Sequence, residues 1–541
     1  MAHSAQNYLS ALNDEKLDQK VWTDTQVPQS EKADSRQVKN NAGGFTFQLD
    51  QMGRLDRFLI LGADKPTYYV GKDRLALENA KSVVDLIKQG KGKDVVARTV
   101  EISVQGRAIK NAPAVFVLGL AATMGDAEVK KAAFEALPKV CRTATDMFAF
   151  VEVLDKNGKW NNAAKRGVAN WYLSKSNDQI AFQAVKYQQR NGWSHRDVLR
   201  LAHVKPADEQ MSAVFHWVAK DHARKGDVAL PEIIDTFEAL KRAKHTHEVI
   251  ALIKNRKGVT WEMVPTEFYK TASVWEALIP TMGYTALIRK LGQLSSTGLL
   301  KPMSDSFKIV RDRLENAEAI KKARVHPVAI LNALAVYKKG AGEKGSLTWQ
   351  VNNQMKDVLT DAFYGSFATV EPSGENYLLG VDCSGSMFSC QASGTSLTAA
   401  EVAACMALAT ARVEKNYWIG GFNHAMGELK ISPKMSLDQV LNVMRNFSWG
   451  STDCAQPMLH AMERGMHNVN KFCVYTDNET WAGRVHPHEA LKRYRAKHVG
   501  DAKLIVAGTS VTDFTIADPS DPGMLDIVGF DSAAPQLISN F

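Results

Sequence analysis

One change of hydrophobic pattern divides this chain and limits the folds that are open to it. From about residue 50 to 365, apolar residues recur every three or four positions, as in LALENAKSVVDLIKQG and AILNALAVYKKG, with Gly, Pro, Ser or Asn breaks between the runs. This period is typical of amphipathic helices. After Pro372, short apolar runs rich in β-branched and aromatic residues alternate with helical stretches. The pattern predicts an all-α part followed by an α/β part.

The helical part is too long for a single bundle. Some 300 residues of short paired helices are typical of a HEAT-like helical-repeat solenoid, with repeats of about 40 to 47 residues and roughly seven units. Residues 1–48 are polar, with breaks at Pro28 and Gly43, and are predicted to form an N-terminal arm. The predicted domains are therefore the arm, a helical domain over 49–368 and an α/β domain over 369–541.

The last third of the chain contains four strand-like runs separated by helical stretches. The runs are YLLGVD (377–382), YWIGGF (417–422), KFCVYTD (471–477) and AKLIVAG (502–508). Strand–helix alternation at this spacing predicts a doubly wound parallel sheet. Ligand sites in such sheets lie at the carboxyl ends of the strands.

Oxygen-bearing side chains follow three of the predicted elements. Asp382, Ser384 and Ser386 come directly after the first strand, Thr452 lies in WGSTD, and Asp477 ends the third run. Carboxylate and hydroxyl oxygens are the ligands that Mg²⁺ and Ca²⁺ prefer. D-x-S-x-S with a distant Thr and Asp resembles the metal-ion-dependent adhesion site of von Willebrand factor A domains. We predict a divalent cation, with Mg²⁺ favoured; the alternative is ordinary turn chemistry.

An enzymatic interpretation of the same residues is weaker. Ser384 or Ser386 would have to act as a nucleophile, but the sequence has no G-x-S-x-G elbow and places no His beside them. We predict no catalytic residues and no enzyme.

Positive charge is concentrated in the helical part. The net charge of +9 combines 13 Lys and Arg against 18 Asp and Glu in residues 371–541 with 54 against 40 in residues 1–370. A basic domain attracts polyanions, of which RNA and DNA come first. The alternative is a merely solvated surface.

The densest basic stretch is residues 163–206, with eight Lys and Arg against two acids. Lys186 and Arg190 are four apart and would share a face if one helix contained both. Ser194 and Asp197 form a predicted capping box that places His195 and Arg196 in a first helical turn, where anions are favoured. Val198, Leu201 and Ala202 are expected on the apolar face of this helix. The predicted RNA-binding residues are Lys165, Arg166, Lys186, Arg190, His195, Arg196 and Arg200; a solvated helix face is the alternative.

The cysteines and the apolar content bear on the compartment. Six irregularly spaced Cys, mostly among apolar neighbours, favour reduced buried thiols over disulfides or a zinc site. The start MAHSAQNYLS lacks a secretory signal pattern, and no window approaches about 18 uninterrupted apolar residues. We expect a cytoplasmic protein, also nuclear if eukaryotic, without membrane contact.

Several long stretches resemble one known family. WSHRDVLRLAHVKP, KKARVHPVAILNALAVYKKG (321–340), GSTDCAQPM (450–458), YTDNETWAGRVHP (475–487) and FTIADPSDPGMLDIVGF (514–530) are similar to the Ro autoantigen family, whose members carry a TROVE module followed by a von Willebrand A domain. The resemblance runs from about residue 50 to the end. It does not cover the arm, and GVDCSGSMFSCQASGTS has its own loop content.

The resemblance implies a fold and a function. In the family, the helical repeats close into a monomeric ring with a basic hole, and the A domain joins its ends. Y RNAs bind the outer basic surface, and single-stranded 3′ ends of misfolded noncoding RNAs enter the hole. The protein is a scaffold in RNA quality control and stress survival, in bacteria alongside exoribonucleases. By position, the RNA surface corresponds to Lys186, Arg190, His195 and Arg196, and the metal ligands correspond to Asp382, Ser384, Ser386 and Thr452, with Asp477 less directly.

The sequence therefore predicts a noncoding-RNA-binding scaffold that carries a divalent cation. Two alternatives stay open. One is a metal-dependent protein-interaction module whose helical part binds acidic proteins; the other is a hydrolase centred on the cation site.

Overall fold

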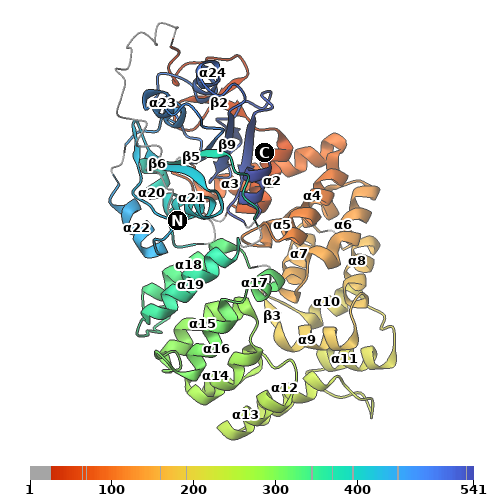
Figure 1. The fold of residues 1–541 in the computed structure, drawn as a ribbon. Coiled ribbons are helices and arrows are strands. Elements are labelled where there is room, and N and C mark those ends of the chain that lie inside the picture. Colours follow the sequence, from red (N-terminus) through yellow and green to blue (C-terminus); the bar gives the residue numbers. More distant parts are fainter. Residues whose placement is uncertain are drawn as a thin grey trace.

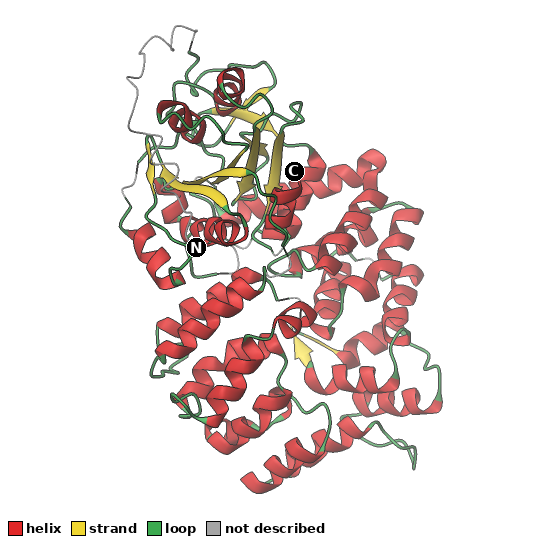
Figure 2. Ribbon diagram, viewed as in Figure 1, coloured by secondary structure: helices red, strands yellow, loops and turns green. Residues whose placement is uncertain are grey.

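The computed structural model describes residues 26–541, apart from 64, 69, 159, 191, 324, 343–344, 368–369, 393–394, 448–449 and 532. The first 25 residues of the predicted arm lie outside the described residues. Figures 1 and 2 show a curved array of helices that leaves the α/β domain on one side and returns to it on the other. This confirms the predicted fold class, a helical-repeat ring followed by a doubly wound A-type domain.

Short helices that pack against their near neighbours in sequence build the helical part. α5 packs against α4, α6 and α7, and α6 packs against α8, which is the pattern of a repeat array. Capping boxes begin several helices: Thr143 and Asp146 bond reciprocally at α7, and Ser176 and Gln179 do so at α9. The helices are α2 (Gln51–Leu61), α3 (Lys72–Leu86), η2 (Ile87–Lys91), α4 (Gly92–Gln105), α5 (Ala112–Met124), α6 (Ala127–Val140), α7 (Ala144–Lys156), α8 (Asn162–Leu173), α9 (Asn177–Lys186), α10 (His195–Ala202), α11 (Glu209–Ala219), α12 (Glu232–Arg242), α13 (Thr246–Asn255), η3 (Trp261–Met263), η4 (Thr266–Lys270), α14 (Ala272–Leu278), η5 (Ile279–Thr281), α15 (Tyr284–Ser296), α16 (Asp305–Leu314), α17 (Ala317–Ala323), α18 (Pro327–Lys338) and α19 (Asn353–Gly365).

The α/β domain has a six-stranded sheet of order β11-β9-β8-β5-β6-β7. Neighbouring strands are parallel except β7, which pairs antiparallel with β6. Its strands are β5 (Asn376–Asp382), β6 (Asn416–Phe422), β7 (Met426–Glu428), β8 (Lys471–Thr476), β9 (Lys503–Gly508) and β11 (Met524–Val528). Its helices are α20 (Gly385–Ser389), α21 (Ala399–Val413), α22 (Leu437–Arg445), α23 (Gln456–Glu463), α24 (Pro487–Lys497) and α25 (Ala534–Asn540). The four predicted strands are confirmed.

Alternate side chains of each central strand enter two different cores. In β8, Cys473 and Tyr475 belong to the core shared with α21 and the helical part, whereas Phe472 and Val474 belong to a second core with α23 and α24. Because side chains alternate across a strand, a sheet covered on both faces reads as an almost unbroken apolar run. This is why the sequence pattern revealed these strands.

Both ends of the helical array contact the α/β domain. At the first end, the guanidinium of Arg57 on α2, which is 1% exposed, pairs with Asp526 at 2.6 Å and donates to the carbonyls of Thr512 and Phe514. At the other end, Lys338 of α18 and Lys356 of α19 both pair with Asp438, at 2.6 and 3.2 Å. The α/β domain therefore closes the ring.

The described end of the arm is packed on the α/β domain. β1 (Gln37–Lys39) and β10 (Phe514–Thr515) flank the central strand β2 (Phe45–Gln48) in a small antiparallel sheet. Gln29 and Gln37 are buried. We call residues 28–48 the N-terminal strap.

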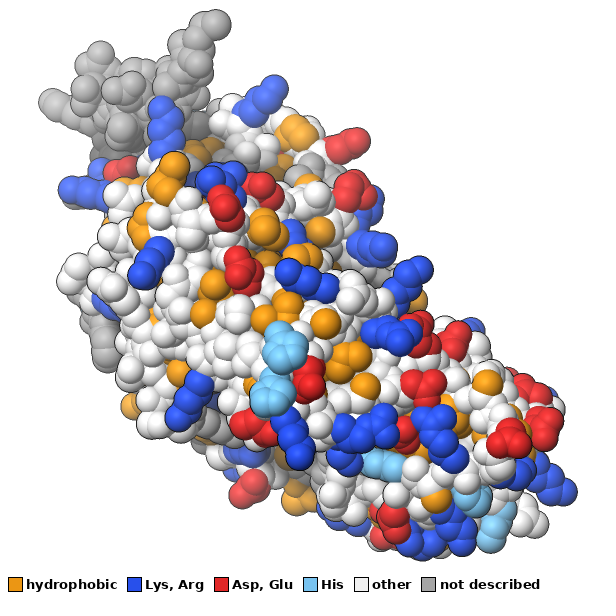
Figure 3. Space-filling view, turned by 90° about the horizontal axis from the view of Figure 1, so that it is seen from below, with side chains coloured by type: hydrophobic (Ala, Val, Ile, Leu, Met, Phe, Trp, Pro, Cys, Tyr) orange, Lys and Arg blue, Asp and Glu red, His pale blue; other side chains and the backbone are white. Residues whose placement is uncertain are grey.

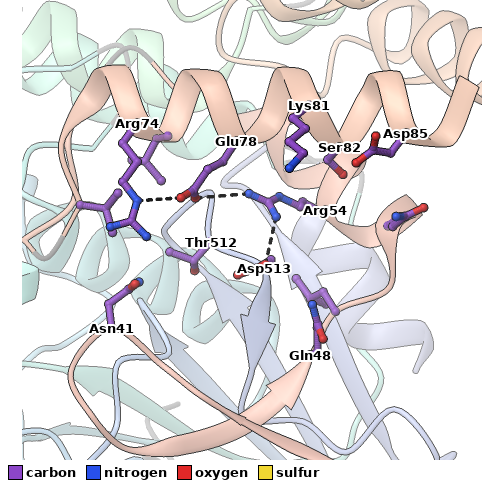
Figure 4. Close-up of a pocket in the computed structure, with 14 residues that line it drawn as sticks. Asn41, Gln48, Arg54, Arg74, Glu78, Lys81, Ser82, Asp85, Thr512 and Asp513 are labelled. Carbon is purple, nitrogen blue, oxygen red and sulfur yellow. Dashed lines mark hydrogen bonds and ion pairs between the residues drawn. The ribbon is translucent and has the colours of Figure 1, made fainter. Parts of the chain in front are cut away.

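A polar cleft of about 410 Å³ lies where the strap, α2, α3 and the loop before β10 meet (Figure 4). Arg54 pairs with Glu78 at 3.5 Å and with Asp513 at 3.0 Å, and Arg74 also pairs with Glu78, at 2.7 Å. These charges satisfy one another across the junction, so the cleft joins the helical part to the α/β domain rather than offering a free anion site.

All six cysteines are free; five are buried and Cys390 is half-buried. Among the described residues, no helix has the length and apolar character needed to cross a membrane.

Candidate metal centre and basic surface

The predicted cation ligands meet at the carboxyl ends of β5 and β8. Asp382 is the last residue of β5, and the chain then turns into α20 through Ser384 and Ser386. The amide of Ser384 donates to the Asp382 carboxylate at 2.9 Å, and the Ser384 and Ser386 hydroxyl oxygens are 3.1 Å apart. The Ser386 hydroxyl also bonds the carboxylate of Asp477, which follows β8. Neighbouring parallel strands thus deliver four of the five predicted ligands to one place.

Thr452 comes from a third loop that lies against the other two. The amide of Gly385 donates to the carbonyl of Gly450 at 3.3 Å, and the carbonyl of Thr452 accepts from the amide of Trp481 at 3.0 Å. All five predicted ligands are buried. The predicted cation seat, defined as Asp382, Ser384, Ser386, Thr452 and Asp477, is therefore an enclosed set of oxygen donors.

The electrostatics of this seat favour a bound cation. Burial raises the pKa of Asp382 to about 7, and the negative charge of Asp477 adds to the effect; burial also raises the pKa of Asp477. Among the described residues, no Lys or Arg forms an ion pair with either carboxylate. Two adjacent buried carboxylates without a basic partner, together with hydroxyl groups, fit the oxygen-rich donor set of Mg²⁺ or Ca²⁺.

The cation seat borders a narrow cavity that is also lined by residues of the helical part. Ser386 and Asp477 line a cavity of about 30 Å³ together with Leu61, Pro66 and Tyr68, which lie at and after the end of α2. A space of this size admits one or two water molecules. The serine hydroxyls bond each other and the carboxylates, which is not the arrangement of an activated nucleophile.

The predicted RNA-binding residues fall on four elements. Lys165 and Arg166 lie in the first half of α8, and Lys186 ends α9. Arg190 lies in β3 (Gln189–Arg190), which forms a hairpin with β4 (Trp193–Ser194), and Arg196 and Arg200 lie on α10. Because α8 packs against α10, the structure brings the cations of these two helices into one region. Arg166, Arg190 and Arg200 are exposed and Lys165 is half-buried. Arg196 is also half-buried, and its side chain pairs with Asp221 at 2.8 Å.

The structure corrects two details of this stretch. Lys186 and Arg190 do not share a helix face, because α9 ends at Lys186 and the chain turns into the β3–β4 hairpin, with Gly192 at a φ of 79°. Leu201 is 37% exposed, and Leu199 takes the predicted place on the apolar face of α10.

Lys186 is set apart from the α8 and α10 cations. Its side chain lines a cavity of about 290 Å³ with Val259, Trp261, Tyr284 and residues near them. Its ammonium lies 5.3 Å from the ring centres of Phe182 and Tyr187. Lys186 therefore faces the elements that follow α13.

His195 is a core residue rather than an RNA contact. The predicted capping box of Ser194 and Asp197 is present, but the His195 ring is only 3% exposed. Its Nδ1 is 2.9 Å from the Tyr172 hydroxyl, and its ring meets Phe148 edge-on at 5.0 Å. Burial lowers the pKa of His195 to about 4, so the ring is neutral at pH 7. Donation to RNA or stacking on a base would need a side chain that reaches the surface.

The structure adds basic residues that sequence reasoning missed. Lys175 lines a groove of about 700 Å³ together with Arg142, Lys257 and the half-buried ring of Phe182. Its ammonium lies 3.6 Å from the Trp171 ring centre, and burial lowers its pKa to about 8. Arg142 and Lys257 are far from Lys175 in sequence, so no local pattern groups them. On the lower face of the molecule, Lys and Arg side chains also gather with acids between them (Figure 3).

Comparison with known proteins agrees with both parts of the fold. Residues 38–336 match the TROVE domain family, and residues 376–541 match the Ro60 vWA domain family. The RNA-binding protein RO60 of Deinococcus radiodurans is 38% identical over 517 residues, covering 95% of this chain and 97% of the relative. The RNA-binding protein RO60 of Caenorhabditis elegans is 32% identical over 592 residues, covering 95% and 91%.

A solved structure shares the whole architecture. The crystal structure of the Ro (RSR) protein of Deinococcus radiodurans matches with a TM-score of 0.68 at 36% sequence identity, covering 91% of this chain and 99% of that one. Two domain families in the same order, and relatives matched almost from end to end, lead to one conclusion. The chain belongs to the Ro protein family, in which a TROVE domain precedes a von Willebrand factor A domain.

Proposed function

We propose that this protein binds small structured noncoding RNAs through its helical part and acts as a scaffold, not as an enzyme. The observation that carries the proposal is the cationic surface of α8, the β3–β4 hairpin and α10. We define this basic surface as the half-buried Lys165 and the exposed Arg166, Arg190 and Arg200. Two relatives that match this chain over more than 90% of their own length are named RNA-binding proteins. More specifically, we propose that its ligands are Y RNAs and misfolded RNAs with single-stranded 3′ ends. Its proposed role is in RNA quality control and stress survival.

The basic surface and the groove beside Lys175 have the physical features that RNA binding requires. RNA is recognised largely by shape, by phosphate contacts and by unpaired bases that stack on side chains. The basic surface offers charge for phosphates, and the 700 Å³ groove places Phe182 beside Lys175 and Arg142. An unpaired base stacked on Phe182 would leave its phosphates close to these cations.

A titration with a small structured RNA bearing a single-stranded 3′ tail tests the proposal. Four phosphate contacts give a slope of about −3 for log affinity against log salt, so affinity falls roughly 50-fold between 50 and 200 mM salt. An excess of double-stranded DNA should not displace the RNA. Equal displacement by the DNA would contradict specific recognition of RNA, and no binding at 50 mM salt would contradict the proposal itself.

The cation seat is the second part of the proposal. Asp382, Ser384, Ser386 and Thr452 would hold a divalent cation, Mg²⁺ being favoured, with Asp477 as a ligand or as the acceptor of a bound water. When bound, the cation supplies positive charge that neutralises the buried carboxylates and holds three loops together. Because Ser386 and Asp477 face a cavity of only about 30 Å³, we assign this role to assembly. An exoribonuclease or another protein partner would dock elsewhere on the surface.

The proposed site of action is the cytoplasm. The free and mostly buried thiols support a reducing compartment.

A further inference from the structure

Gln29 of the N-terminal strap is inserted between two loops of the α/β domain. The side chain is fully buried. Its Nε2 donates to the Asp453 carboxylate and to the Val485 carbonyl, both at 2.7 Å, and its Oε1 accepts from the Thr480 hydroxyl. Both amide hydrogens and the amide oxygen are therefore used. The Gln29 backbone is also fixed, because its amide donates to the Gly483 carbonyl at 2.9 Å.

The two loops that Gln29 joins are those of the cation seat. Asp453 directly follows Thr452, and Thr480 lies three residues after Asp477. The loops also touch each other, since the Thr480 hydroxyl accepts from the amide of Cys454 at 3.0 Å. Gln29 thus adds a link between the loop of one proposed ligand and the loop of another.

The rest of the strap reinforces the loop that follows β8. Asn40 donates from its side chain to the Thr480 carbonyl at 2.8 Å. The Glu479 carboxylate accepts from the side chain of Asn41 at 2.8 Å and from the amide of Ala42 at 2.9 Å. A Cβ added at Gly44 would lie 1.9 Å from the Thr480 carbonyl oxygen, so the strap approaches this loop as closely as glycine allows.

These ties bear on the seat because the two loops have little regular structure of their own. Residues 451–453 and 477–482 contain no helix or strand. Ladder hydrogen bonds hold Asp382 at the end of β5, but the spacing between Thr452 and Asp477 depends on contacts made by side chains and turns. Partners that hold metal ligands in place typically change metal affinity about 10- to 100-fold when they are lost.

We infer that the N-terminal strap is a positioning element of the cation seat, with Gln29 holding the Thr452 and Asp477 loops at the spacing that the cation requires. This inference rests on the proposed cation seat. Coupling between binding events is reciprocal, so a bound cation also holds the strap on the α/β domain.

Thermal unfolding of the full chain at increasing Mg²⁺, starting from EDTA-treated protein, tests the inference. Wild type should gain melting temperature with Mg²⁺, and Asp382→Ala should gain none. Gln29→Met keeps the side-chain volume but removes the hydrogen bonds, and Gln29→Ala removes both. Each should raise the half-saturating Mg²⁺ concentration by about 10-fold or more.

Arg36→Ala is the matched control within the strap. Arg36 pairs with Asp34 at 2.6 Å and with Asp518 at 2.8 Å, so the variant weakens strap docking away from the seat loops. It should lower the melting temperature with and without Mg²⁺ and leave the half-saturating concentration unchanged. If the Gln29 variants match wild type in half-saturation, the inference is wrong. If the melting temperature of wild type does not change with Mg²⁺, the proposed cation seat is wrong, and this inference is wrong as well.

Hydrogen exchange of wild type gives a second readout that needs no variant. The amides of Gln29 and Phe45, which bond Gly483 and Gln29 respectively, should exchange more slowly when Mg²⁺ is added to the EDTA-treated protein. Unchanged exchange there, alongside a melting temperature that does respond to Mg²⁺, would show that the cation and the strap are not coupled.

Discussion

Replacing Lys165, Arg166, Arg190 and Arg200 together by Gln is expected to weaken binding of a small structured RNA about 100-fold. Each lost phosphate contact removes counterion release, so the slope of log affinity against log salt should flatten by about three. The four side chains come from α8, β3 and α10, and none is among the buried residues of α8 and α10, which the variant leaves unchanged. Fluorescence anisotropy at several salt concentrations measures both quantities.

A matched variant separates a specific surface from net charge. Lys415, Lys430, Lys434 and Lys497 are exposed on the α/β domain, and their replacement by Gln removes the same charge. RNA affinity should then change less than threefold, which is about 0.65 kcal/mol. An equal loss in the two variants would mean that RNA responds to overall charge and that the basic surface is not the site.

The His195→Ala variant is expected to lose about 3 kcal/mol of unfolding free energy at pH 7. The substitution leaves a cavity beside Phe148 and removes the hydrogen-bond partner of the buried Tyr172 hydroxyl. Denaturant unfolding measures the loss. The control His247→Ala, at an exposed position on α13, should cost about 0.5 kcal/mol or less.

The pH dependence of this difference follows from the pKa of His195. Its pKa is about 4 in the folded protein against 6.5 for an ordinary His, so only the unfolded chain gains a proton as pH falls from 6.5 to 4. Wild type therefore loses stability over this range, by about 3 kcal/mol from this ring, and the variant lacks that loss. The difference in unfolding free energy between wild type and His195→Ala should narrow towards pH 4. A difference in unfolding free energy that stays constant with pH would contradict burial of the ring. Because the ring is buried, any effect of His195→Ala on RNA binding would act through the fold.

Much of the fold could be predicted because the signals are local. The period of apolar residues revealed the helices, and β5, β6, β8 and β9 are apolar runs because the sheet is covered on both faces. The short strand β7, with sequence MGE, has no such run and was missed. The grouping of Asp382 with Asp477 was also predictable, since the carboxyl ends of neighbouring parallel strands meet.

The position of His195 on α10 carries a local signal of burial, although RNA binding was predicted for this residue. His195, Val198, Leu199 and Ala202 are spaced i, i+3, i+4 and i+7, which is one helix face, and all four are buried. A His on the apolar stripe of a helix is better interpreted as a core residue with a hydrogen-bond partner.

The remaining features depend on contacts between distant parts of the chain. Gln29 bonds Asp453 across 424 residues, and Arg57 pairs with Asp526 across 469 residues. The residues at the end of α2 that line the cavity beside the cation seat are likewise far from the seat in sequence. No periodicity or motif carries such information, so a polar N-terminal segment appeared to be a free arm.

Ultraviolet crosslinking of the full chain to a small structured RNA with a single-stranded 3′ tail, followed by peptide mapping, locates the RNA on the protein. If the helical ring binds the RNA, the crosslinked peptides come from residues 162–202 and include Phe182 in the groove beside Lys175. Crosslinks confined to residues 376–541 would contradict it, because RNA would then bind the α/β domain and not the helical ring.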